Sequence, residues 1–341
     1  MHDLHEVVFM PADIKVAVPG GTSLLEAARI AGLRPEAPCD GRGTCGKCRV
    51  LVEGNLTLPT EKELAQLNSG DGIKMRLACQ AKISGPVRAE FPESRADSFL
   101  TVEKGQRKAL KLNPRGYRPG QESYGIALDI GTTSIVAELL DLASGQSLGV
   151  SSCLNPQTVY GGDVLTRITY AANRAGGVQT LQSEVAGGIN RLIENLCRTQ
   201  GIRAEQVFEI TVAANTTMLH LLLGVNPRSL AVAPYQPVFT RETEVSPGTV
   251  GIRIAPDGLV TLLPSASAFV GADIIAGLLT TDFHHFKEPA LFIDIGTNGE
   301  IMAIKDGQLA GTSSAAGPAL EGMNITCGCR AEQGAIEAVS I

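Results

Sequence analysis

The stretch that decides the fold is residues 38–48, PCDGRGTCGKC, together with Cys79 further along the chain. It carries Cys39, Cys45 and Cys48 in the spacing C-x5-C-x2-C, and 30 residues separate Cys48 from Cys79. Three thiols on one glycine-rich loop, with a fourth from a distant segment, are the ligand pattern of a two-iron, two-sulfur (2Fe–2S) cluster. The stretch therefore predicts an iron–sulfur site that exchanges single electrons.

The other residues of this loop suit an anionic cluster. Three glycines allow the loop to curl tightly and to direct backbone N–H groups at the sulfurs: Gly41, Gly43 and Gly46. Three basic residues place positive charge beside the four thiolates: Arg42, Lys47 and Arg49. The first cysteine gap is one residue longer than in plant-type ferredoxins, and the spacing resembles that of adrenodoxin-like ferredoxins.

The cysteines fit a zinc site or a disulfide framework less well. A zinc knuckle needs two close C-x2-C pairs, and here only Cys45 and Cys48 form one. A disulfide framework is typical of small secreted chains, unlike this chain of 341 residues. The glycines also spell the dinucleotide fingerprint G-x-G-x-x-G, but they lie between cysteines, without a surrounding strand and helix. We expect the remaining four cysteines to be buried thiols: Cys153, Cys197, Cys327 and Cys329.

Composition limits the class of protein. A net charge of −6, only 4% aromatic residues and no Trp argue against a nucleic-acid partner. The N-terminus lacks a basic-then-apolar signal segment, and no apolar run reaches membrane-spanning length. Eight cysteines without a secretory signal indicate a cytoplasmic protein.

Residues 1–92 are predicted to form an α+β ferredoxin domain of the β-grasp type. Two capping boxes, Ser23 to Glu26 and Thr60 to Glu63, mark the starts of helices. The expected elements, in order, are two strands within 5–18, a helix at 24–32, a strand at 48–54, a short helix after Thr60 and a strand at 75–83 that carries Cys79.

An internal repeat follows a polar, basic segment at 93–123, which we expect to be a solvated linker. The stretch 127–152 resembles the stretch that begins at Leu291, and each contains three short strands and the motif Asp-Ile-Gly-Thr. Between the copies we expect helices at 163–174 and 178–200, a strand at 207–213 and a helix from about 272. Repeated strand units separated by helices predict two related α/β lobes, over 124–288 and from 289 to 341.

The Asp-Ile-Gly-Thr motifs suit the binding of phosphate. The first copy offers Asp129 for magnesium through water, Gly131 for close approach of the backbone, and the hydroxyls of Thr132 and Thr133 for phosphate oxygens. The second copy offers the corresponding residues Asp294, Gly296, Thr297 and Asn298. A single such motif is also a common hairpin turn, but two copies in matching context favour a clamp on the β- and γ-phosphates. A P-loop fold is not expected, because the sequence has no Walker motif.

These motifs carry a family resemblance. DIGTTS and DIGTNGE resemble the phosphate-1 and phosphate-2 motifs of the superfamily of actin, sugar kinases and heat-shock ATPases (the ASKHA fold, which is ribonuclease H-like). With the ferredoxin cysteines in front, the chain resembles the ATP-dependent reductive activators of corrinoid proteins. Four further stretches extend the resemblance over nearly the whole chain: 155–168, 213–224, 263–278 and 315–337.

The resemblance implies a repair reaction. An electron from the 2Fe–2S cluster would reduce Co(II) to Co(I) in a corrinoid methyl-carrier protein, and Mg²⁺-ATP bound between the lobes would drive this step. The implied partners are that corrinoid protein and an upstream electron donor, while formation of a homodimer and the catalytic residue for ATP hydrolysis stay open. Two alternatives also stay open: a ferredoxin-type electron carrier whose actin-like part only binds a partner, and an actin-fold kinase with a redox sensor.

Some residues and one boundary remain ambiguous. Asp163 and Asn215 suit helix caps at least as well as ligands, and Glu300 suits either a water-orienting role or an ordinary strand surface. The five histidines show no ligand spacing. The 53 residues from 289 to 341 are too few for a usual domain, and the adenosine-binding glycine motif of a second lobe is missing. We therefore expect the second lobe to be truncated and the natural chain to continue beyond Ile341.

Overall fold

The computed structural model describes residues 3–315, apart from Arg34, Glu36, Pro38, Asp40, Thr297 and the stretches 68–73 and 93–111. Thr297, Cys327, Cys329 and the quoted stretch 315–337 beyond Ala315 therefore lie outside the described residues. The chain divides into two compact units: residues 1–98 with 158–162, and residues 99–157 with 163–341.

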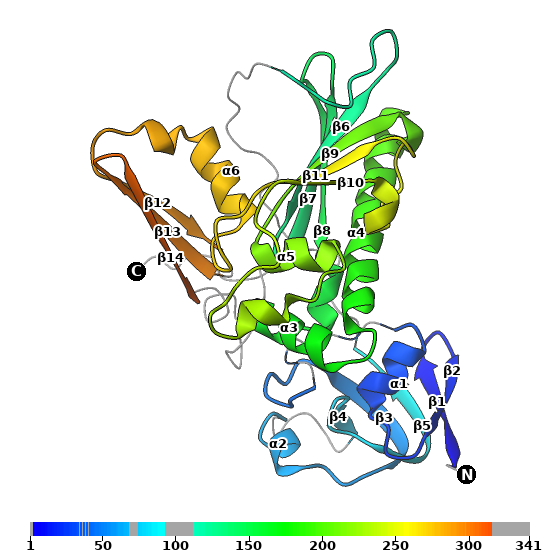
Figure 1. Cartoon of the computed structure of the whole chain (residues 1–341). Helices are drawn as coiled ribbons and strands as arrows, with labels where there is room; N and C mark the ends of the chain where they lie inside the picture. Colours follow the sequence, from blue (N-terminus) through cyan, green and yellow to red (C-terminus); the bar gives the residue numbers. More distant parts are fainter. Residues whose placement is uncertain are drawn as a thin grey trace, which may run out of the picture. The chain divides into compact units, whose positions relative to one another are not determined.

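The first unit contains a five-stranded mixed sheet and two short helices (Figure 1). Its elements are β1 (Leu4–Met10), β2 (Ile14–Pro19), α1 (Leu24–Ile30), β3 (Arg49–Leu56), α2 (Glu61–Leu64), β4 (Met75–Leu77) and β5 (Ile83–Glu90). The strand order is β2-β1-β5-β3-β4; β1 and β5 run parallel and the other neighbours antiparallel. This is the predicted β-grasp arrangement.

Local signals in the sequence explain the start of α1. Ser23 accepts a hydrogen bond from the backbone N–H of Glu26 at 3.2 Å, as expected of a helix N-cap. The helix then buries Leu24 and Leu25 against the sheet, where they meet Phe9 in the core of the unit. The hydrophobic face of α1 thus anchors the polypeptide just ahead of the cysteine loop.

The position of Cys79 differs from the prediction. The strand expected at 75–83 is broken: β4 ends at Leu77, and Cys79 lies in the turn before β5. The carbonyl of Leu77 accepts hydrogen bonds from the N–H groups of Gln80 and Ala81, both at 2.9 Å. The chain turns here because these bonds replace the ladder of a continuous strand.

The end of the predicted linker is bound to the second unit. Arg115 forms ion pairs with Glu242, at 2.9 Å, and with Glu244. Arg118 pairs with Asp257 at 3.0 Å. Residues 112–122 are therefore attached to this unit through opposite charges, whereas a solvated tether was expected.

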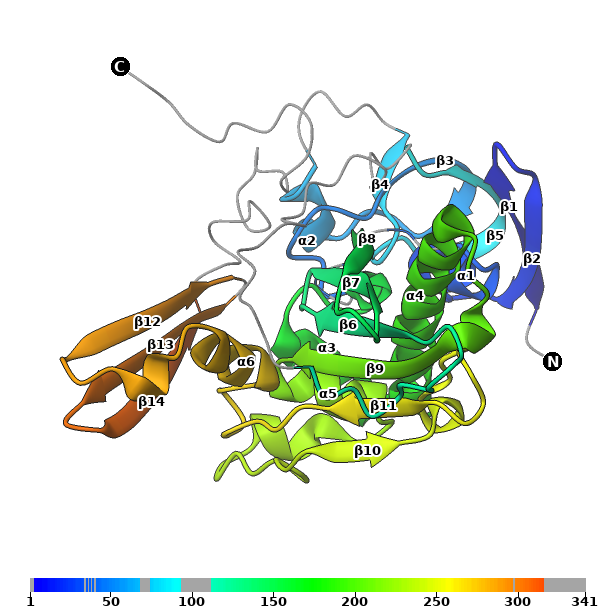
Figure 2. The same cartoon turned by 90° about the horizontal axis from the view of Figure 1, so that it is seen from above.

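The second unit contains a six-stranded sheet. It comprises β6 (Tyr124–Ile130), β7 (Ser134–Asp141), β8 (Ser147–Leu154), β9 (Val207–Ala214), β10 (Thr243–Val245) and β11 (Leu259–Leu262). The order is β10-β11-β9-β6-β7-β8 (Figure 2); β6, β9 and β11 are parallel, and the meander β6-β7-β8 is antiparallel. This topology is ribonuclease H-like, as predicted for an actin-like lobe.

The α-helices in the described part of this unit are α3 (Val164–Asn173), α4 (Gly177–Gln200), α5 (Thr216–Leu222) and α6 (Ala272–Thr280). Of these, α3, α4 and α6 lie close to their predicted positions, whereas no bounds were predicted for α5. Helix α4 lies against β7 and β8, where Leu181, Ile189 and Ile193 are buried. None of the helices in the described part of the chain is long and apolar enough to cross a bilayer.

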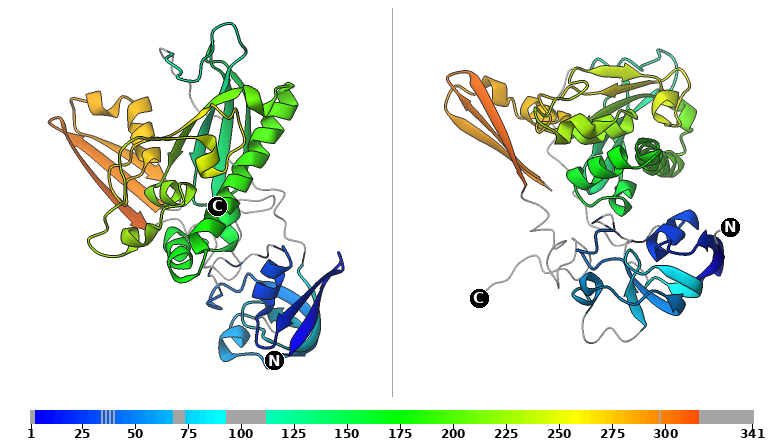
Figure 3. Two further views of the ribbon diagram at one scale, coloured as in Figure 1. Left: turned by 45° about the vertical axis from the view of Figure 1, so that its right-hand side comes forward. Right: turned by 60° about the horizontal axis from the view of Figure 1, so that its bottom comes forward.

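A second, three-stranded sheet follows α6 (Figure 3). It consists of β12 (Ala290–Ile295), β13 (Asn298–Lys305) and β14 (Gln308–Ala315), all antiparallel. One face packs on α6 through Phe292, Met302 and Ile304. The alternate residues of β12, such as Ile293 and Ile295, are exposed.

Candidate functional site

The four cysteines of the first unit lie together. The sulfurs of Cys39 and Cys45 are 3.3 Å apart, Cys39 also has a hydrogen bond with Cys79, and Cys79 has one with Cys48. Hydrogen bonds from Cys45 and Cys79 lower the pKa of Cys39, and a hydrogen bond from Cys79 lowers the pKa of Cys48. A chain of four contacting thiols, two of which are stabilised as thiolates, fits the donor set of a 2Fe–2S cluster.

The cysteine loop is held by its own side chains. Arg42 Nε donates to the carbonyl of Cys39 at 3.1 Å, and Arg49 Nε donates to the carbonyl of Gly46 at 3.3 Å. Gly43 has a φ of 73°, and a Cβ there would lie 2.8 Å from the side-chain nitrogen of Gln80. The arginines that the sequence placed beside the cluster therefore also fix the shape of the loop.

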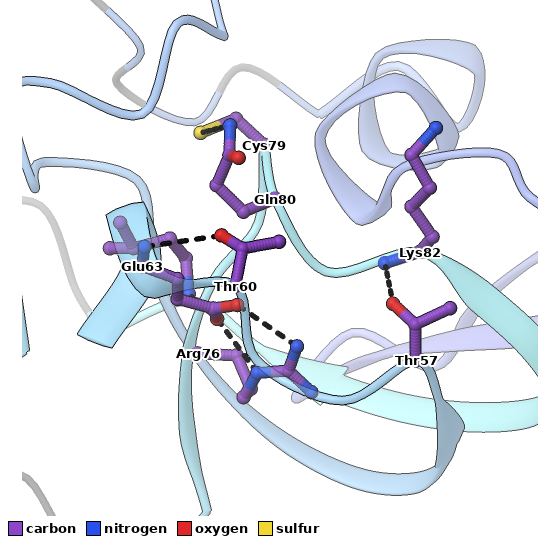
Figure 4. A network of polar contacts seen from close by, with 8 residues as sticks. Thr57, Thr60, Glu63, Arg76, Cys79, Gln80 and Lys82 are labelled. Carbon is purple, nitrogen blue, oxygen red and sulfur yellow. Dashed lines mark hydrogen bonds and ion pairs between the residues drawn. The ribbon is translucent and has the colours of Figure 1, made fainter.

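Gln80 joins the turn that carries Cys79 to the cysteine loop (Figure 4). Its side-chain amide donates to the carbonyl of Gly41 at 2.9 Å and contacts the sulfur of Cys79 at 3.5 Å. An N–H group in contact with a ligand sulfur tunes the electronic properties of the metal site. Sequence reasoning did not identify Gln80, although it directly follows the fourth cysteine.

A buried ion pair supports the same turn (Figure 4). Glu63 is completely buried; its carboxylate accepts from Arg76 at 2.7 and 3.0 Å and from the N–H of Leu77 at 2.8 Å. The N–H of Glu63 donates to Thr60, as the capping box predicted, but its carboxylate turns to Arg76. The pair thus ties α2 to the strand that leads to Cys79.

The first Asp-Ile-Gly-Thr motif forms the turn between β6 and β7. Asp129 stands near the end of β6, and a Cβ at Gly131 would lie 2.9 Å from the carbonyl oxygen of Ser134. Glycine is therefore needed for the tightness of this turn. Thr132 differs from the expectation that its hydroxyl faces a phosphate, because it is buried and accepts a hydrogen bond from Asn215 at 3.1 Å.

Four acidic side chains of the second unit are linked by electrostatic interactions. Asp273 and Asp294 interact with each other and with both Asp129 and Glu300. Asp129 is reached by water, yet the protein around its carboxyl group is dense enough to displace much of the solvent. This desolvation, with the charges of Asp273 and Asp294, raises the pKa of Asp129 to about 6. Desolvation and the charge of Asp294 likewise raise the pKa of Asp273 to about 6.

The second motif contributes two of these acids from neighbouring strands. Asp294 of β12 pairs directly with Glu300 of β13 in the sheet register, a position where like charges are unfavourable. Burial raises the pKa of both carboxyl groups, and Glu300 accepts a hydrogen bond from Ser313 at 3.0 Å. The turn itself is closed by the N–H of Gly296, which donates to the carbonyl of Asn298 at 2.9 Å.

Asp273 was missed at the level of sequence. It lies in the first turn of α6, where an acidic residue is usually assigned to the helix dipole. Its Oδ1 does accept from the N–H of Ile274 at 2.8 Å. A cluster of like charges is costly unless a cation joins it. Among the described residues, however, no three acidic side chains converge closely enough to hold one metal ion directly.

The ambiguous residues have structural roles. Asp163 and Asn215 cap α3 and α5: the side-chain oxygen of Asp163 accepts from Thr166 at 2.8 Å, and that of Asn215 accepts from Met218 at 3.0 Å. His220 is fully buried, with Nδ1 2.7 Å from the carbonyl of Thr216.

Family models match three consecutive parts of the chain. Residues 9–84 match the 2Fe–2S iron–sulfur cluster binding domain. Residues 124–286 match the RACo middle region, and residues 288–341 match the C-terminal domain of RACo, the ASKHA domain.

Individual relatives agree with these models. A protein of Eubacterium limosum named corrinoid activation enzyme RamQ is 38% identical over 216 residues, which is 63% of this chain and 36% of that protein. The [Co(II) methylated amine-specific corrinoid protein] reductase of Methanosarcina barkeri is 30% identical over 223 residues, which is 62% of this chain and 40% of that protein. The matched regions thus cover less than half of each curated relative.

A solved structure is also similar. The structure titled reductive activator for corrinoid, iron–sulfur protein matches with a TM-score of 0.63 and 30% identity, over 99% of this chain and 67% of that chain.

Proposed function

This chain belongs to the family of reductive activators of corrinoid proteins, and from this premise we propose that it takes part in the ATP-dependent reduction of a corrinoid protein. The substrate is the cobalt of a methyl-carrier protein, which gains one electron and passes from Co(II) to Co(I). The observation that carries the proposal is the presence, in one polypeptide, of a four-thiol site and a carboxylate-lined Asp-Ile-Gly-Thr hairpin.

The thiols of the first unit would hold the electron donor. Cys39, Cys45, Cys48 and Cys79 are the ligands, and a 2Fe–2S cluster bound there supplies electrons one at a time. Gln80 and the arginines of the loop direct N–H groups to the sulfur and the backbone of this site. They hold the ligands in place as the charge of the site changes.

The residues of the second unit would hold Mg²⁺-ATP. Asp129, Asp273 and Asp294 would supply carboxylates for magnesium through water. The turn at Gly131 and Thr133, with Gly296, Thr297 and Asn298 of the second motif, would take phosphate oxygens. Magnesium would stabilise the ionised carboxylates of Asp129 and Asp273, whose pKa is raised by desolvation and by neighbouring negative charge.

ATP has a thermodynamic task in this proposal. Ferredoxin-type clusters have potentials of about −400 mV, and reduction of Co(II) to Co(I) is uphill from there. Binding or hydrolysis of ATP would favour a state of the complex in which the cobalt is easier to reduce. The upstream donor that reduces the 2Fe–2S site again after each electron is a further partner.

The test uses the full chain, reconstituted anaerobically with iron and sulfide, and a Co(II) corrinoid protein. We expect the visible spectrum of Co(I) to appear when a reductant and Mg²⁺-ATP are both present, and ATP hydrolysis to increase when the corrinoid protein is added. Electron transfer that is indifferent to ATP would instead indicate a simple carrier. Transfer of phosphate to a small molecule would indicate a kinase with a redox sensor.

A further inference from the structure

Three completely buried polar side chains lie beneath the turn between β6 and β7: Asn155, Gln157 and Arg167. Asn155 and Gln157 follow the end of β8, and Arg167 belongs to α3. None of them has a place in the proposed magnesium or cluster sites. Burying a guanidinium and two amides costs free energy unless their hydrogen bonds are made, so the partners of these groups are informative.

Two of the three side chains, Asn155 and Arg167, donate to carbonyl groups of the phosphate turn. Asn155 Nδ2 donates to the carbonyl of Gly131 at 2.8 Å, and its backbone N–H donates to the carbonyl of Thr133 at 2.8 Å. Arg167 Nη2 donates to the carbonyl of Thr132, which lies between them. Three consecutive carbonyl oxygens are therefore held from the protein interior.

The orientation of these carbonyl groups determines the orientation of the backbone N–H groups of the turn. In a trans peptide unit the C=O and the following N–H point to opposite sides. Because the carbonyls of Gly131 and Thr132 point inward, the N–H groups of Thr132 and Thr133 point to the other side of the turn. Successive N–H groups that share one side form an anion-binding concavity.

Arg167 is itself held in place. Its Nη1 donates to Gln157 Oε1 at 3.2 Å and contacts the sulfur of Met218 at 3.3 Å. The amide of Gln157 in turn donates to the carbonyl of Leu181 in α4 at 2.9 Å. Arginine stays charged under all ordinary conditions, so a permanent positive charge lies behind the turn.

We propose that Arg167 and Asn155 are positioning residues for phosphate binding, which hold the turn from Gly131 to Thr133 so that its N–H groups face the phosphate chain. The inference rests on the proposed nucleotide function and extends it to residues that do not touch the ligand. A role in core packing alone would lower stability but leave the affinity for phosphate unchanged in any variant that folds.

The first test compares Arg167→Lys with Arg198→Lys. Lysine keeps the charge of Arg167 but loses the planar fork that reaches Thr132 and Gln157 together, whereas Arg198 is an exposed residue of α4. Calorimetry on the reconstituted full chain measures the affinity for Mg²⁺-ATP and for magnesium tripolyphosphate. We expect Arg167→Lys to weaken both ligands by about 10- to 100-fold, the equivalent of one hydrogen bond to a charged group, and Arg198→Lys to leave both unchanged.

A second variant, Asn155→Asp, replaces a hydrogen-bond donor of the turn by a side chain of nearly the same volume. The carboxylate cannot donate to Gly131, and it adds a negative charge behind the phosphate site. We expect an affinity loss of at least about tenfold, with circular dichroism and thermal unfolding used to verify the fold. Wild-type affinity in either folded variant overturns the positioning role while the nucleotide function stands.

Hydrogen exchange decides the matter if both variants fail to fold. In the unsubstituted chain, the N–H groups of Thr132 and Thr133 should gain protection when magnesium tripolyphosphate binds, and unchanged exchange would overturn the inference. If the unsubstituted chain binds neither ligand, the proposed nucleotide function fails and the inference fails with it.

Discussion

Glu63 in the first unit and Asp129 in the second are acidic residues with opposite surroundings. Glu63 lies against Arg76 and the N–H of Leu77, so its charge is compensated within the unit. Desolvation and the charges of Asp273 and Asp294 raise the pKa of Asp129. The carboxylate of Glu63 is neutralised by its partners in the same unit, whereas the carboxylates around Asp129 are neighbours of like charge, which we propose to be neutralised by magnesium.

The cysteine site resembles the surroundings of Asp129, because groups of the same type lie close together in both. Its thiols also lie in mutual contact and gain stability from a bound metal centre. The difference is that donors of the same unit already surround it, including Arg42, Arg49 and Gln80. In both candidate ligand sites of this protein, side chains of the same chemical type lie close together: thiols in the first unit and carboxylates in the second.

The largest expected effect separates the two sites. In Cys45→Ser, the reconstituted chain should lose the visible absorption and the paramagnetic signal of the reduced cluster, because one of four ligands is gone. The binding of Mg²⁺-ATP should persist. Cys153→Ser, a substitution on β8 outside the ligand set, is the control and should keep the full signal. Equal loss of cluster and nucleotide binding in folded Cys45→Ser would mean that the sites are not independent.

The second largest effect concerns the contribution of the buried ion pair of Glu63 and Arg76 to stability. Glu63→Gln leaves Arg76 buried without its countercharge and should lower the opening free energy of the first unit by about 3–5 kcal/mol. Glu53→Gln is the matched control, because Glu53 pairs with Lys74 on the exposed surface; we expect no measurable change. Hydrogen exchange of peptides from the first unit, followed by mass spectrometry, measures both. Similar values for the two variants would remove the distinction between a buried and a surface pair.

The acidic cluster should lower the stability of metal-free protein, whereas the ion pair of Glu63 and Arg76 raises the stability of the first unit. The pKa values of Asp129 and Asp273, near 6, lie above those of unfolded chains. The folded state then binds more protons between about pH 4 and 6, so metal-free protein should lose stability as pH rises through this window. In Asp129→Asn, this loss should shrink and the thermal midpoint of metal-free protein at pH 7 should rise by a few degrees.

Magnesium sharpens the same test. At 100 times its Kd, a ligand of the folded state adds about 2.7 kcal/mol of stability, and we expect most of this gain to disappear in Asp129→Asn. The control is Asp306→Asn, an exposed turn residue with a φ of 51° that asparagine also tolerates. Thermal unfolding with and without Mg²⁺ measures both variants. An equal gain in Asp129→Asn and unsubstituted protein would exclude Asp129 as a ligand.

The smallest expected effect concerns Gln80. In Gln80→Ala the sulfur of Cys79 loses one N–H contact. That contact stabilises the more negative, reduced state of the cluster, so its loss makes reduction less favourable. A loss of about 1 kcal/mol corresponds to a potential about 40 mV more negative for one electron. A redox titration followed by paramagnetic resonance measures this shift. An unchanged potential would show that the 3.5 Å contact has no electrostatic effect on the cluster.

Sequence patterns succeeded where a local rule determines structure. The caps at Ser23, Asp163 and Asn215 form because a side-chain oxygen accepts a hydrogen bond from an N–H group three residues away. The repeated hairpins follow from alternating apolar residues around a glycine turn. The strand through Cys79 was wrong because the apolar pattern continues through the turn, and only the bonds to the Leu77 carbonyl interrupt it.

Pairs of residues far apart in the chain could not be predicted from the sequence, for a physical reason. Glu63 and Arg76 are 13 residues apart, and Arg167 meets a carbonyl 35 residues away. Nothing in the local spacing of such residues distinguishes a buried partner from a solvated charge. Asp273 was hidden for the same reason, since a first-turn acid looks like a response to the helix dipole until Asp129 and Asp294 are near it.

The amino-acid sequence by itself determined which groups this protein offers for chemistry: three thiols on a glycine-rich loop with a fourth from a distant segment, and two matching hairpins that we propose to bind phosphate. These features are local, so spacing and residue type are sufficient to specify them. Tertiary structure decided which charges are neutralised inside the protein and which are left for a ligand. That outcome depends on how much water is displaced around each group and on which distant side chains fill the space, and neither quantity is encoded in any short stretch of the chain.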